Sequence, residues 1–168
     1  VAQRGEVSRM ADDDGDWRAD RIETICDDWA ISGNYHEYTF GPVFEADGDL
    51  RLTLNRPFGS EPFGKKDWRG WAMRIDGDGV MHPEAAGLRS PCGVAMGPDS
   101  NIYYTDNQGE WCGASKMSII ERGDFHGHPW GVASTKRPES LVEFPGEIPD
   151  GIPRPEAAKR IPNFKLPV

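Results

Sequence analysis

Two residues with useful chemistry stand just before two similar segments of the chain. His36 lies five residues before Gly41, and Arg89 lies four residues before Gly93. A histidine can act as a general base near neutral pH, and an arginine can hold a carboxylate with two parallel hydrogen bonds. Each residue also has an ordinary interpretation, His36 as a structural histidine bonded to a backbone carbonyl and Arg89 as the partner of a surface acid.

The segments that follow these residues form an internal repeat with an offset of 52 residues, 41–55 against 93–107. In each copy an apolar strand runs into an Asp-containing turn, and a second strand follows in which apolar and polar residues alternate. Each copy is therefore predicted to be a β-hairpin. Four positions are identical in the two copies: Gly41/Gly93, Asp47/Asp99, Thr53/Thr105 and Asn55/Asn107.

Further strands are predicted at 71–76 and 115–120, which gives units of about four strands, as in the blades of a β-propeller. The chain of 168 residues would hold about three such blades, and three blades leave open sheet edges. We therefore predict an all-β fold, a partial propeller over residues 1–131, whose missing blades belong to the rest of the same parent chain. Residues 132–168 hold seven of the 14 prolines and are predicted to be an inter-blade loop or linker. The alternative fold is a complete small β-sandwich.

Hairpin geometry predicts which polar residues share one end of the fold. The residues before the first strand and after the second strand of a hairpin lie at the same end, so both repeats contribute to one rim. This rim is a candidate pocket, and the alternative is a set of ordinary polar loop residues. Its predicted members are His36, Glu37, Arg89, Asp106, Asn107, Gln108 and Glu110.

Two other clusters have the residue types of metal ligands. His126 and His128 would share one face of a strand, although Gly127 and Pro129 favour a packing turn instead. Near the N-terminus, acidic residues occupy positions 1, 3, 5, 9 and 12 of a twelve-residue calcium loop, but the sixth position holds Trp17 instead of the usual glycine. The alternative for this segment is a solvated acidic turn between strands. The five acids are Asp12, Asp14, Asp16, Asp20 and Glu23.

Composition excludes several classes of function. The 28 acidic residues exceed the 19 basic ones, and a formal charge of −9 argues against nucleic acid as a partner. No apolar run approaches 18 residues, so no membrane span is predicted. Six tryptophans and four tyrosines indicate a folded chain instead of a disordered one.

The segments 87–109 and 123–129 resemble those of the soluble quinoprotein sugar dehydrogenases, which are six-bladed propellers acting on glucose, aldoses or sorbosone. The resemblance covers roughly residues 5–131. It is closest to large bacterial proteins of planctomycetes and verrucomicrobia described as membrane-bound dehydrogenases, which often carry a haem-binding cytochrome c domain. The resemblance implies an extracytoplasmic protein that oxidises a sugar-like substrate and passes electrons to cytochrome c or to a fused haem domain.

The same resemblance implies roles for individual residues. His36 would be the catalytic base, and Arg89, in Gly87-Leu88-Arg89, would contact pyrroloquinoline quinone (PQQ). The loop after the second hairpin would complete the cofactor site, with backbone carbonyls at Gly109 and Glu110 holding Ca²⁺. The residues of that loop assigned to the cofactor are Asn107, Gln108, Gly109 and Glu110.

Several positions depart from the family pattern. Ser90 replaces an asparagine, Glu110 replaces a proline, and an acidic pair that follows the metal loop is absent at 112–115. These differences keep two other functions open. One is a non-catalytic propeller that binds carbohydrate or protein, and the other is a calcium-dependent lactonase that would use Asp106 and Asn107 as ligands.

Overall fold

The computed structural model describes residues 1–58, 67–109 and 113–143, and these ranges fold mainly into antiparallel β-sheet. They contain nine strands and one short 3-10 helix, so the predicted all-β class is confirmed. No helix in this part of the chain is long and apolar enough to cross a membrane.

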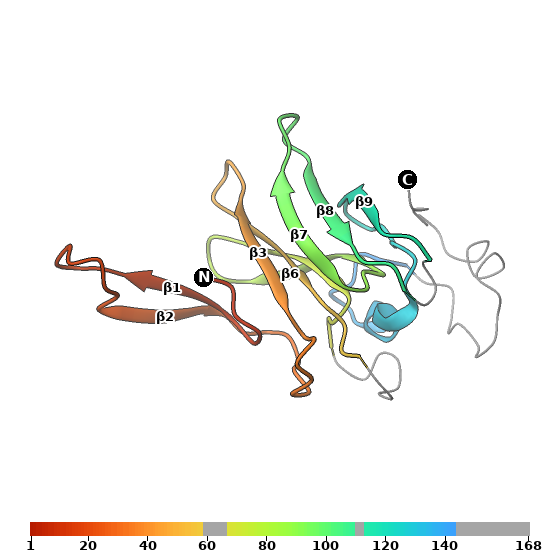
Figure 1. Cartoon of the computed structure of the whole chain (residues 1–168), viewed down its shortest axis with the longest axis horizontal. Helices are drawn as coiled ribbons and strands as arrows, with labels where there is room; N and C mark the ends of the chain where they lie inside the picture. The colour runs from red at the N-terminus through yellow and green to blue at the C-terminus, as the bar shows by residue number, and fades with distance from the viewer. Residues whose placement is uncertain (59–66, 110–112, 144–168) are drawn as a thin grey trace.

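The first two strands form a hairpin that extends away from the rest of the structure (Figure 1). β1 (Val7–Ala11) and β2 (Arg21–Cys26) pair in antiparallel fashion, and residues 12–20 connect them. Val7 and Cys26 at the base of the hairpin are buried in the main core. The hairpin is thus anchored at one end, while its turn is exposed to solvent.

The central sheet is a four-stranded meander, β3 to β6 in sequence order. The alternating leucines of the predicted hairpin lie in its second strand, and the turn at Gly48 adopts the positive φ of 95° that glycine tolerates. The strands are β3 (Thr39–Phe44), β4 (Leu50–Leu54), β5 (Trp71–Ile75) and β6 (Met81–Ala86).

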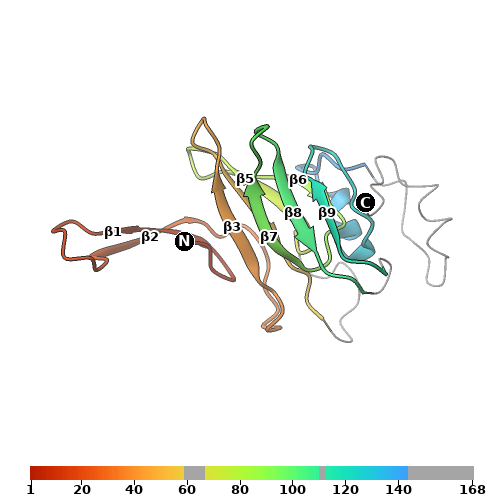
Figure 2. The ribbon, with the colours of Figure 1, turned by 45° about the horizontal axis from the view of Figure 1, so that its top comes forward.

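The second sheet repeats the start of the central sheet after 52 residues, as the sequence predicted. Its strands β7 and β8 carry the same relative numbering as β3 and β4, and β9 follows within the predicted segment 115–120. β3 and β7 run side by side (Figures 1 and 2). The strands are β7 (Pro91–Met96), β8 (Ile102–Asp106) and β9 (Lys116–Ile119).

Both faces of the central sheet are buried, whereas the alternation in β4 suggested one apolar and one polar face. Leu54 pairs with Trp71 on the face that meets the main core. Thr53 pairs with Ala72 on the opposite face, where Ala72 packs with Tyr104 and other apolar residues of the second sheet. These small side chains let the second sheet approach closely, and Thr53 is fully buried as a result.

The chain returns to the central sheet after β9. Phe125 forms a parallel bridge with Ala86 of β6, and the indole nitrogen of Trp71 donates a 3.0 Å hydrogen bond to the carbonyl of Gly131. Gly131 lies in the 3-10 helix η1 (Pro129–Lys136), and Val142 beyond it is buried in the main core. The predicted division after residue 131 therefore falls inside a helix that packs on the sheet. Residues 144–168 of the predicted linker lie outside the described ranges.

Candidate functional site

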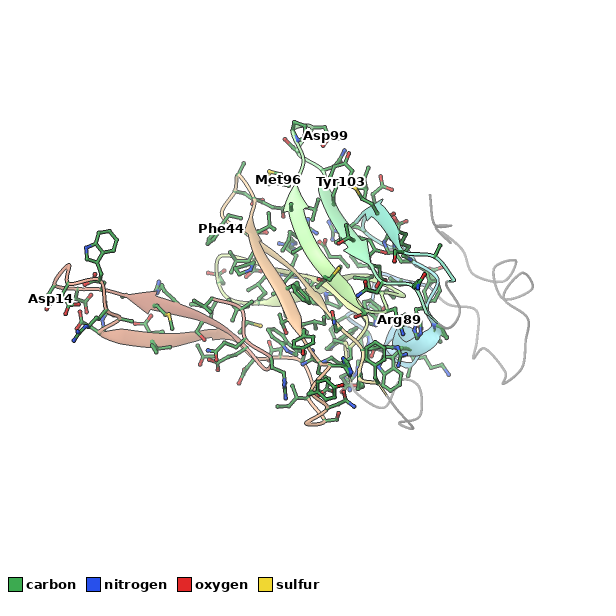
Figure 3. The ribbon with its side chains drawn as sticks, viewed as in Figure 1. Asp14, Phe44, Arg89, Met96, Asp99 and Tyr103 are labelled. Atoms are coloured by element: carbon green, nitrogen blue, oxygen red, sulfur yellow. The ribbon has the colours of Figure 1, made fainter. Side chains whose placement is uncertain are left out.

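One end of the two repeated hairpins gathers the loops that the sequence predicted for the rim. Thr39 at the start of β3 lies opposite Leu54 at the end of β4, and Pro91 of β7 lies opposite Asp106 of β8 in the same way. Because β3 and β7 are neighbours, the loops at these strand ends meet. Figure 3 shows Arg89 at this end of the second sheet and Asp99 at the other.

Phe58 is the centre of this rim. The ring of His36 lies with its centroid 4.4 Å from the Phe58 centroid. The guanidinium carbons of Arg56 and Arg89 lie 4.2 and 4.6 Å from the same ring, at distances where a cation is attracted to the aromatic face. The structure therefore brings the predicted base and the predicted arginine to one phenylalanine, from two hairpins that are distant in the sequence.

The rim carries two neighbouring positive charges. Arg56 is only 4 % exposed, and burial is the main cause that lowers the pKa of its guanidinium from 12.5 to about 10. Repulsion by Arg89 lowers the pKa of Arg56 further, while attraction by Asp106 raises it. Since Arg56 stays protonated at neutral pH, this part of an acidic chain is locally cationic, and an anionic ligand would be attracted to it.

Asp106 positions Arg89 through the backbone. Its two carboxylate oxygens accept hydrogen bonds from the amides of Arg89 at 2.9 Å and Ser90 at 2.7 Å. The side-chain amide of Asn107 reaches the Ser90 carbonyl at 3.4 Å. Asp106 is thus engaged in holding the turn that carries Arg89, in contrast to the metal-ligand role that a lactonase would require.

Gly109 lies directly against Arg89. A Cβ atom at Gly109 would lie 2.2 Å from Cζ of Arg89 and 2.4 Å from its Nη2, so no larger residue fits while Arg89 keeps this position. The backbone amide of Gln108, next in the loop, donates to Ser115 Oγ at 3.3 Å. Of the predicted cofactor-binding set, Arg89, Asn107, Gln108 and Gly109 are therefore close together, and Glu110 lies outside the described residues.

His36 is half-buried in a stack of aromatic rings. Its imidazole lies between Phe58 and Tyr35, with a centroid separation of 3.9 Å to the tyrosine ring. Its backbone amide donates to Asn34 Oδ1 at 3.0 Å. The stack fixes the plane of the imidazole and leaves the residue at the rim, as predicted.

Glu37 is not a member of the rim, in contrast to the prediction. Its side chain is buried and accepts hydrogen bonds from the backbone amide of Ser32 at 2.9 and 3.1 Å and from its hydroxyl at 2.8 Å. Adjacent residues of an extended segment point in opposite directions, so Glu37 turns inward while His36 faces the rim. Its carboxylate closes the loop that carries His36.

Arg69 fixes the same loop from below, and the sequence analysis did not identify it. Its fully buried guanidinium donates to the carbonyls of Ala30 at 2.9 Å, Glu37 at 3.1 Å, Tyr38 at 3.3 Å and Arg4 at 2.7 Å. Burial lowers the pKa of Arg69 to about 10. The signal available in the sequence is an arginine between two tryptophans, which places a cation among residues expected in a core. Arg56 and Phe58 were missed for a similar reason, because their loop was assigned to the rim without roles for its members.

The acidic segment near the N-terminus is a turn at the tip of the β1–β2 hairpin, far from Arg89 (Figure 3). It brings Asp12, Asp14 and Asp20 together, with one carboxylate oxygen of each within 4.8 Å of the others. Glu23 lies on β2 and pairs with Arg9 and Arg21. Asp16 accepts a hydrogen bond from the amide of Arg18 at 2.8 Å. The segment is flanked by strands, and three of its five predicted ligands form a group.

His126 and His128 are buried in the turn after β9, in agreement with a packing role. Gly127 between them has a φ of 104°, which interrupts a regular strand. Nδ1 of His128 accepts a 3.2 Å hydrogen bond from the Trp130 amide at the start of η1. Burial, followed by repulsion from Arg56, holds the pKa of His128 well below 6.5, so the ring is neutral under physiological conditions.

A shallow groove of about 390 Å³ lies at the opposite end of the β3–β4 hairpin from His36. It is lined mainly by apolar side chains of β1 and of this hairpin, including Val7, Met10, Phe44 and Leu50. None of the predicted site residues lines it, so it is separate from the rim around Phe58.

Comparisons with known proteins identify the fold. No protein-family model matches the chain, and no curated protein is similar to it in sequence. Two solved structures described as glucose dehydrogenase are similar to it, with TM-scores of 0.57 and 0.53 and sequence identities of 18 % and 19 %. Each similarity covers 95 % of this chain and 46 % of the solved one. The chain thus spans about half the length of these structures and has a fold like that part of a glucose dehydrogenase.

Proposed function

We propose that this chain is part of a six-bladed β-propeller that oxidises a sugar-type alcohol by hydride transfer to bound PQQ. The observation that carries the proposal is the meeting of His36 and Arg89 at the ring of Phe58. These residues come from two hairpins with one repeat length between them, and the solved structures with a similar fold are described as glucose dehydrogenases. The three sheets would be consecutive, partly complete blades.

The residues around Phe58 fit a flat cofactor that carries carboxylates. Two guanidinium groups supply positive charge there, and the closeness of Gly109 to Arg89 keeps side chains away from that position. Arg89 would hold PQQ, with Asn107 and Gln108 beside it, and the carbonyls of Gly109 and Glu110 would hold Ca²⁺. When bound, the quinone supplies the two-electron acceptor for the hydride.

His36 would act as the base. The substrate hydroxyl gives its proton to the imidazole while the hydride leaves the same carbon, so that a carbonyl product forms and the acceptor is reduced. The stack of Tyr35 and Phe58 holds the imidazole plane in place before substrate binds. In an extracytoplasmic setting, electrons would then pass to cytochrome c or to a haem domain of the same chain.

Calorimetric titration with PQQ in the presence of Ca²⁺ tests the cofactor assignment. We expect dissociation constants in the micromolar range, weakened about tenfold or more by Arg89→Ala because a charge-assisted contact is lost. Arg18→Ala, which changes an exposed arginine of the β1–β2 turn, should leave binding unchanged. His36→Ala should bind PQQ but fail to reduce an electron-accepting dye with glucose.

The same titration separates the dehydrogenase from the non-catalytic alternative. Absence of PQQ binding by the unaltered protein would contradict the dehydrogenase assignment and favour a propeller that only binds carbohydrate or protein. Equal losses from Arg89→Ala and Arg18→Ala would show that the effect is one of overall charge and not of the rim.

A further inference from the structure

Aromatic rings continue along the rim beyond the residues assigned to catalysis. The ring of Tyr38 meets His36 edge to face at a centroid distance of 6.4 Å, and Phe40 lies 6.1 Å farther along. With the stacked rings of Tyr35 and Phe58, they form a continuous strip. We define the aromatic strip as Tyr35, His36, Phe58, Tyr38 and Phe40.

The strip is open to solvent where its tyrosines lie. Tyr35 is 64 % exposed and Tyr38 is 45 % exposed, although large aromatic side chains usually bury most of their surface in a fold. A tyrosine in such a place offers an apolar ring face together with a hydroxyl group that can form hydrogen bonds. This combination matches the surface of a sugar ring, which has apolar C–H faces and a polar edge.

The backbone that carries the strip is held in place before any ligand binds. Arg69 binds the carbonyls of Glu37 and Tyr38 from the buried side. The side-chain amide of Asn34 donates to the Phe58 carbonyl at 2.6 Å and so ties together the two loops that supply the rings. Little ordering entropy would remain to be lost on binding, which favours recognition of an extended ligand.

We propose that the aromatic strip binds a gluco-oligosaccharide chain, with its end at His36 and successive sugar units on Tyr38 and Phe40. Centroid separations of 6.4 and 6.1 Å along the strip are on the scale of one sugar unit. The inference rests on the proposed function in one respect, because the end at His36 is the sugar that would be oxidised. It commits the site to chains of several units, for which a single glucose would be a weak ligand.

Calorimetry without quinone tests this proposal separately from catalysis. The probes are glucose and the cello- and malto-oligosaccharides of two to five units. We expect the affinity for at least one of the two linkages to rise about tenfold or more from glucose to the tetrasaccharide. Tyr38→Ala and Tyr35→Ala should each weaken tetrasaccharide binding about three- to tenfold, the range that corresponds to one lost aromatic contact.

Trp17→Ala is the matched control, because Trp17 is a 95 % exposed aromatic residue at the tip of the distant β1–β2 hairpin. It should leave the affinity unchanged, and thermal melting of all three variants should show that each is folded. Affinity that does not depend on chain length, absence of binding to either series, or an equal loss in Trp17→Ala would overturn the proposal. Since no quinone is present, these outcomes are independent of whether the protein binds PQQ.

Discussion

Replacement of Arg69 by methionine tests whether one buried cation holds the loop that carries His36. Methionine keeps an unbranched apolar stem of similar length but removes all five N–H donors of the guanidinium. The carbonyls of Ala30, Glu37, Tyr38 and Arg4 would lose the donor that each now has in Arg69. The change leaves the surface untouched, because Arg69 is fully buried.

The magnitude follows from two opposing contributions. The fall in the pKa of Arg69 from 12.5 to about 10 means that burial makes the charged form about 3 kcal/mol less favourable in the folded protein. Hydrogen bonds from a charged donor each contribute about 1.5–3 kcal/mol, and Arg69 makes four. The bonds outweigh the cost of burial, so we expect Arg69→Met to lower the free energy of unfolding by about 3–5 kcal/mol.

Urea denaturation measures this loss, and hydrogen exchange of the amides from Ser32 to Tyr38 shows where it arises. The control is Arg18→Met in the exposed β1–β2 turn, which should change stability by less than about 0.5 kcal/mol. A loss below about 1 kcal/mol for Arg69→Met, or unchanged exchange in the loop, would refute the reasoning that this cation holds the loop.

Three further predictions concern single residues. Gly109→Ala should displace Arg89, since its methyl would lie 2.2 Å from Cζ; we expect PQQ affinity to fall about tenfold in calorimetry with little change in melting temperature, and unaltered affinity would contradict this. The depressed pKa of His128 means that only the unfolded chain gains a proton as the pH falls below 6.5. Stability should therefore be full above pH 7 and decline below 6.5 by up to about 1.4 kcal/mol per pH unit. His128→Asn, which keeps an acceptor for the Trp130 amide, should flatten this slope in urea titrations at pH 7.5 and 5, and an equal slope in both proteins would count against the assignment. Gly87→Ala should cost about 2 kcal/mol or more of unfolding free energy, because φ is 83° and the new Cβ would lie 2.8 Å from two backbone nitrogens; a wild-type denaturation midpoint would show that the turn can adjust.

The paired hairpins were predictable because their signals are local. Asp-Gly turns and alternating leucines fix the strands and the turn of residues 39–54, and the same pattern recurs after 52 residues. The burial of Thr53 could not be read in this way, because it depends on the second sheet packing against Ala72 across the strand pair. Local periodicity reports which face a residue occupies but not what covers that face.

The rim shows a similar limit. Hairpin geometry placed His36 and Arg89 at one end of the fold, and they do meet there through Phe58. It could not show that Glu37 turns inward to Ser32, since a single residue decides which side of an extended segment faces the core. The contribution of Arg69 was equally hidden, because its partners are backbone carbonyls that any residue type would provide.

The return of the chain to β6 has a consequence for the order of synthesis. Strands β3 to β6 are complete as a sheet once Ala86 has been made, yet the groups that cover Trp71 and Ala86 come from Phe125, Gly131 and the residues that follow. On the ribosome, the central sheet would emerge with this surface still bare, and it would stay bare while the second sheet was being translated. The two sheets therefore form one cooperative folding unit, whose completion waits for the segment around η1.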